Sequence, residues 1–148
     1  MTATSTTHRP RTAIPEETFH RLSTRLAAEN PDFTDLYIGR IIDQTLAFLD
    51  ACARTPDTPL TPSKPVDLGW HTFLLHTVDY TDFCQRAAGR FLHHVPTSPD
   101  DETSADPNAT VTAMRALGLP VDNDLWATAL TGDCTQCHAG CFDSPKAS

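Results

Sequence analysis

The feature that most constrains the fold is an apolar stripe between residues 38 and 52. Its residues recur at the three- and four-residue spacing that places side chains on one face of an α-helix. Leu46 and Phe48 widen this face, so the pattern predicts a long helix that Asp32 or Thr34 caps and that ends near Arg54. The stripe consists of Ile38, Ile41, Ile42, Thr45, Leu49 and Cys52, and Cys52 is therefore predicted to be a core residue.

Proline and glycine divide the rest of the chain into shorter helices. Four prolines exclude a helix from residues 55–65, and Pro31, Gly89 and Gly118 each follow a helical pattern. Thr77 is expected to break one apolar stretch into two helices. The predicted helices lie at about 15–30, 32–54, 66–76, 78–88 and 108–117, with a last short helix within 119–130. No β pattern is present, so the predicted fold class is all-α, a small irregular bundle of four to six helices.

The 148 residues fit one domain with polar ends. The helical core is predicted to span residues 14–96, and the polar composition of its flanks favours little order. The predicted segments are a disordered N-terminus at 1–13, the core domain at 14–96, a polar linker at 97–107, C-terminal helices at 108–131 and a Cys-rich tail at 132–148.

Charge and composition exclude two classes of partner. The net charge of -8 argues against binding a nucleic acid backbone, which requires clustered Lys and Arg. No apolar run approaches the ~20 residues of a membrane span, and no secretory segment opens the chain. Five Cys is an odd number that favours thiols over a disulfide framework. We therefore expect a cytoplasmic protein that binds neither nucleic acid nor membrane, with a protein partner still open.

The densest group of chemically capable side chains lies between residues 66 and 96. Asp67 and His71 are four residues apart, so they share a face of the predicted helix, and the carboxylate can orient the imidazole of a metal-binding His. His93 and His94 are adjacent in an extended segment and point to opposite sides. One of them, His94 in preference, is predicted to join His71 at a metal site. The alternative is that both His are structural and bond to backbone.

Other polar and aromatic residues of this stretch are predicted to serve the core. Trp70 and Phe83 are expected in the core, and a buried Tyr80 would need a hydrogen-bond partner for its hydroxyl. His76 and Cys84 would share a face with Tyr80 only in an unbroken helix. Cys84 is thus open as a core thiol, a ligand or a nucleophile paired with a His.

The tail carries a second candidate metal motif, C-x2-C-H-x2-C, at Cys134, Cys137, His138 and Cys141. Cys pairs at this spacing form half of many zinc sites, so the three thiolates are predicted ligands, joined by a His from elsewhere. A tail of thiols without metal is the alternative, and haem attachment at the CxxCH string would require export. The predicted metal, zinc, would thus be held by residues from the set Asp67, His71, His94, Cys134, Cys137 and Cys141.

The stretch also resembles the glycine-rich-domain-containing-protein-like family, over about Ile41–Pro96. The features that carry the resemblance are Val66-Asp67, Trp70-His71, Tyr80, Phe83-Cys84, Gly89, Phe91 and His93-His94-Val95-Pro96, preceded by the helix through Leu49 and Cys52. The resemblance implies a small helical domain and brings no settled reaction. This chain has only 6 Gly, so nothing known of Gly-rich regions carries over.

Three functions follow as hypotheses. The first is a metal-binding helical domain, with zinc as the expected ion. The second is a protein-interaction or accessory module in which the same motif only determines the fold. The third is a metal-dependent enzyme, although the sequence holds no recognised catalytic signature.

Overall fold

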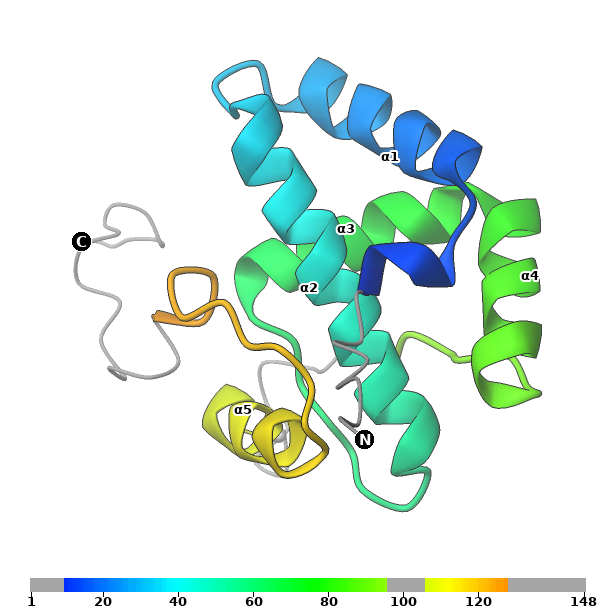
Figure 1. Cartoon of the computed structure of the whole chain (residues 1–148), viewed down its shortest axis with the longest axis vertical. Coiled ribbons are helices and arrows are strands. Elements are labelled where there is room, and N and C mark those ends of the chain that lie inside the picture. Colours follow the sequence, from blue (N-terminus) through cyan, green and yellow to red (C-terminus); the bar gives the residue numbers. More distant parts are fainter. Residues whose placement is uncertain (1–9, 96–105, 128–148) are drawn as a thin grey trace, which may run out of the picture.

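The structure, a computed structural model, describes residues 10–95 and 106–127 (Figure 1). These residues contain no strand, which confirms the all-α prediction. Within the described ranges, no helix is long and apolar enough to cross a membrane. The elements are the 3-10 helix η1 (Pro10–Ala13) and the α-helices α1 (Glu16–Glu29), α2 (Asp35–Arg54), α3 (Lys64–Leu75), α4 (Thr77–Ala88) and α5 (Pro107–Ala116).

Helix α2 lies at the centre of the bundle and contacts every other described α-helix (Figure 1). Thr34 caps it by accepting a hydrogen bond from the Tyr37 N–H, as one of the two predicted caps. The predicted stripe is buried from Ile38 to Leu49, whereas Cys52 is only partly buried against the core. The apolar stripe therefore does position the core, and α2 provides the surface on which the other helices pack.

The boundaries of the other helices follow the predicted stops. Gly89 and Gly118 both have positive φ, 69° and 75°, the left-handed conformation that glycine adopts most easily after a helix. The break between α3 and α4 falls at His76, one residue before the predicted position. Helix α3 begins two residues earlier than predicted, because Ser63 caps it and Pro65 fits its first turn.

The structure corrects part of the prediction of a disordered N-terminus at 1–13. Residues 10–13 form the 3-10 helix η1. Here η1 packs on α2, and the Arg11 guanidinium forms an ion pair with Asp43 at 3.0 Å and lies 4.1 Å over the Phe19 ring. The Arg86 side chain donates a hydrogen bond to the Ala13 carbonyl. These contacts compensate for the polar composition of the segment. The remainder of the prediction, for residues 1–9, lies outside the described residues.

The segment after α5 docks on α2, as expected. Trp126 is fully buried, and its indole N–H donates to the Gln44 side-chain oxygen at 2.8 Å. The Arg40 guanidinium pairs with Asp122 at 2.7 Å and holds the pKa of that carboxyl below its usual range. In the described part of the predicted last helix, up to residue 127, a turn occupies residues 123–126 and residues 119–122 have no regular secondary structure. Most of the predicted linker and the whole Cys-rich tail lie outside the described residues.

Helices α2 and α3 approach closely at Gly69, which yields the first testable prediction. A Cβ atom at this position would lie 2.2 Å from Thr45 Oγ1 and 2.9 Å from Ile41 Cγ2. Gly69→Ala is therefore expected to push the helices apart and to lower the free energy of unfolding by about 1–3 kcal/mol in urea denaturation. Gly39→Ala is the matched control, because its Cβ would meet the flexible end of the Arg11 side chain. Equal stability of the two variants would contradict the close approach.

Candidate metal site

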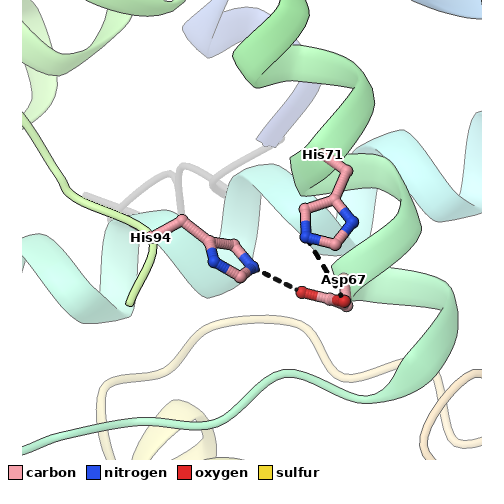
Figure 2. A group of neighbouring side chains, drawn as sticks. All are labelled: Asp67, His71 and His94. Carbon is pink, nitrogen blue, oxygen red and sulfur yellow. Dashed lines mark hydrogen bonds and ion pairs between the residues drawn. The ribbon is translucent and has the colours of Figure 1, made fainter. Parts of the chain in front are cut away.

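Three side chains from two segments converge beside the first turns of α3 (Figure 2). Asp67 and His71 lie one turn apart on α3, and His94 comes from the extended segment that follows α4. His94 Nε2 lies 2.7 Å from Asp67 Oδ1, and His71 Nε2 lies 3.6 Å from Asp67 Oδ2. One potential ligand atom from each residue lies within 4.8 Å of the other two. The structure thus brings together the three residues that the sequence analysis selected from this stretch.

The three side chains differ in their access to solvent. The His94 side chain is 15% exposed, Asp67 is 34% exposed and His71 is 54% exposed. His94 therefore forms the inner wall of the cluster, and His71 borders the solvent. Both Nε2 atoms face the Asp67 carboxylate, so the two imidazoles and the carboxylate oxygens border one small volume (Figure 2).

Trp70 supports the buried side of the cluster. Its ring lies 4.4 Å from the His94 ring, and the His71 ring lies 4.5 Å from the other histidine, measured between centroids. His94 is thus in contact with the rings of both Trp70 and His71. Trp70 directly precedes His71 on α3, so the same turn of helix provides both a ligand candidate and a packing surface.

Tyr80 of α4 holds the segment that carries His94. Its buried hydroxyl accepts a hydrogen bond from Trp70 Nε1 at 3.0 Å and donates one to the Leu92 carbonyl. The Leu92 N–H donates to Cys84 Sγ at 3.4 Å, so the backbone is held two residues before His94. The sequence indicated that a buried Tyr80 requires a partner, but it carried no signal for the identity of that partner.

The remaining His and Cys candidates of the described chain lie elsewhere. His93 is exposed with its ring 4.8 Å from Phe91, so the adjacent histidines do diverge as predicted. The His76 Nδ1 atom bonds the Thr72 carbonyl. Cys84 is a buried core thiol, and burial raises the pKa of the Cys52 thiol to about 12. Neither thiol is therefore suited to metal binding or to nucleophilic attack.

The donor set at Asp67, His71 and His94 fits a transition metal ion. Two imidazoles and a carboxylate are ligands of zinc, and the same set binds iron in other proteins. Two ligand atoms of a tetrahedral zinc ion lie roughly 3.3–3.5 Å apart, as bonds of about 2.0–2.1 Å require. The 3.6 Å pair is close to this spacing, whereas the 2.7 Å pair requires the Asp67 carboxylate to move slightly from His94.

Comparison with known proteins places this arrangement within an uncharacterised family. A family model described as UCP032817-like matches residues 10–114, which include the whole cluster and all helices except the end of α5. The match confirms the resemblance to a family without known function, but its description does not support the glycine-rich name. No curated protein and no solved structure matches the chain.

Proposed function

The chain belongs to the uncharacterised UCP032817-like family, and we propose its function from the geometry of the site. We propose that the protein binds one transition metal ion, zinc in preference, through Asp67, His71 and His94. The observation that carries the proposal is the convergence of one donor atom from each residue within 4.8 Å. The ion would join α3 to the segment after α4.

Two features of the surroundings support this proposal. The Trp70 ring and the Tyr80–Leu92 hydrogen bond hold His94 in place before any ion binds, which lowers the cost of organising the ligands. The inner His94 is 15% exposed, so an ion would be partly shielded from water, which strengthens its interaction with the carboxylate.

The test is metal analysis of the full chain, purified without chelator. We expect about one equivalent of zinc, and loss of most of that metal in His94→Gln, because a metal site with fewer ligands binds more weakly. Added zinc at 100 times its Kd should raise the free energy of unfolding by about 2.7 kcal/mol in the unaltered protein. The matched control is His93→Gln, which replaces the exposed neighbour and should keep the metal.

A structural role is the competing function, and the 2.7 Å contact between His94 and Asp67 favours it. In that case the cluster fastens the segment after α4 to α3, as in an interaction or accessory module whose motif only determines the fold. Less than about 0.2 equivalents of metal in the unaltered protein, together with a loss of stability in His94→Gln, would support this function and refute metal binding.

A further inference from the structure

The outer side of the cluster of Asp67, His71 and His94 combines an exposed ligand with a nearby cation. Lys64, the first residue of α3, is the single lysine in the part of the chain that the structure describes. We propose that an ion held by the cluster keeps a coordination position open toward the solvent, and that a small carboxylate-bearing molecule occupies this position and also contacts Lys64. The inference rests on the proposed function, since it concerns the same ion.

The first step is the number of ligands. Within residues 10–95 and 106–127, the group of potential metal ligands consists of these three residues, each with one donor atom within 4.8 Å of the others. A structural zinc ion takes four protein ligands, whereas a zinc ion held by two histidines and a carboxylate keeps a position for water or a substrate. The same donor set leaves open positions on iron. The composition of the cluster therefore fits an ion that binds an external molecule.

The second step is the direction of the open position. The Trp70 ring lies 4.4 Å from the His94 ring on the inner side, and the His94 side chain is 15% exposed. The His71 side chain is 54% exposed and that of Asp67 is 34% exposed, and both lie on α3 (Figure 2). An external ligand can therefore approach the ion from the solvent side, next to the His71 ring.

The third step is charge. A divalent ion bound to one carboxylate and two neutral imidazoles keeps a net charge of about +1. A carboxylate at the open position neutralises this charge, whereas a neutral ligand leaves it unchanged. Because the cluster is partly shielded from water at His94, the ion attracts an anion more strongly there than it would in bulk water. The position therefore favours a small anion, and carboxylate oxygen is a donor that zinc accepts.

The fourth step is the position of Lys64. Lys64, Asp67 and His71 are separated by three and four residues, so they share one face of α3. Side chains of a helix lean toward its N-terminus, so Asp67 and His71 lean toward the turn that carries Lys64. A cation in the first turn opposes the helix dipole, so the stability of α3 does not account for this lysine. Its ammonium has three N–H donors and can contact a carboxylate while it keeps another partner.

Titration of the cobalt-loaded full chain tests the open position, because the visible absorption of Co²⁺ changes with the number and type of its ligands. Acetate is the anionic probe and imidazole is the neutral probe, both at constant ionic strength because salt screens exposed charges. We expect each probe to change the cobalt spectrum along a saturable one-site curve, while the amount of bound cobalt stays the same.

Variants of Lys64 test the contact with the anion. Lys64→Gln is expected to weaken acetate binding about two- to fivefold, the loss expected for one exposed ion pair, and to leave imidazole binding unchanged. Lys64→Arg retains the charge and should keep the acetate affinity. Arg25→Gln is the matched control and should bind acetate as the unaltered protein does. Arg25 forms an exposed ion pair with Glu29 and lines a groove with His76, at the opposite end of α3 from Lys64.

The outcomes separate this inference from the function on which it rests. A cobalt spectrum that neither probe changes, or one with a sulfur-to-cobalt charge-transfer band, would show that the coordination shell is closed. Either result would overturn the inference and leave the proposed function intact. Equal acetate affinities of Lys64→Gln and the unaltered protein would overturn the contact with Lys64. Failure to bind cobalt or zinc at all would refute the proposed function itself.

Discussion

Phe48→Ala is expected to lower the free energy of unfolding by about 3–5 kcal/mol, the range for loss of a fully buried aromatic side chain. Phe48 is fully buried on α2 and lies between the two tryptophans, 5.3 Å from the Trp70 ring and 6.4 Å from the Trp126 ring. Removal of its ring leaves a cavity where Phe48 contacted Trp70 of α3 and Trp126 of the C-terminal segment. Since the free energy of unfolding of a native protein is about 5–15 kcal/mol, the variant loses a large part of its stability.

Urea denaturation followed by circular dichroism measures this effect. Leu36→Ala is the matched control, because Leu36 lies on the same helix with 76% of its surface exposed and should change stability by less than about 0.5 kcal/mol. A loss of under about 1 kcal/mol in Phe48→Ala would show that the two tryptophans do not depend on this ring for their packing.

The sequence predicted the helices well because their ends are local events. Thr34 and Gly89 act through hydrogen bonds and dihedral angles within a few residues, so each could be assigned without a partner. The divergence of His93 and His94 also followed from a local rule, the alternation of side chains in an extended segment. The four-residue spacing of Asp67 and His71 placed both on one face of α3 for the same reason.

The contacts that assemble the site were not predictable, because they join residues far apart in the chain. Asp67 lies closer to His94, at 2.7 Å, than to its helical neighbour His71, at 3.6 Å. The close approach at Gly69 depends on Thr45 of another helix, and a glycine within a helix gives no indication of its neighbour. Arg11 likewise orders η1 through Asp43, although the composition of the N-terminus favours disorder.

Tyr80→Phe is expected to lower the free energy of unfolding by about 2–4 kcal/mol, although it removes a single oxygen atom. The hydroxyl is buried and joins Trp70 Nε1–H to the Leu92 carbonyl, so its loss leaves two buried polar groups without their partner. Burial raises the pKa of Tyr80, so the hydroxyl keeps its proton and donates to Leu92 across the neutral range. Unfolding in urea measures the cost, and Tyr37→Phe, at a partly exposed ring of α2, provides the control.

The same variant connects stability to the proposed metal site, because Leu92 lies two residues before His94. Without this hydrogen bond the segment is held less firmly, and the His94 ring can move more freely against Trp70. Groups that orient metal ligands typically change affinity by about 10–100-fold, so we expect zinc to bind Tyr80→Phe at least about tenfold more weakly. Unchanged zinc affinity in a destabilised Tyr80→Phe would mean that Tyr80 supports the core alone, and that Asp67 and Trp70 suffice to place His94.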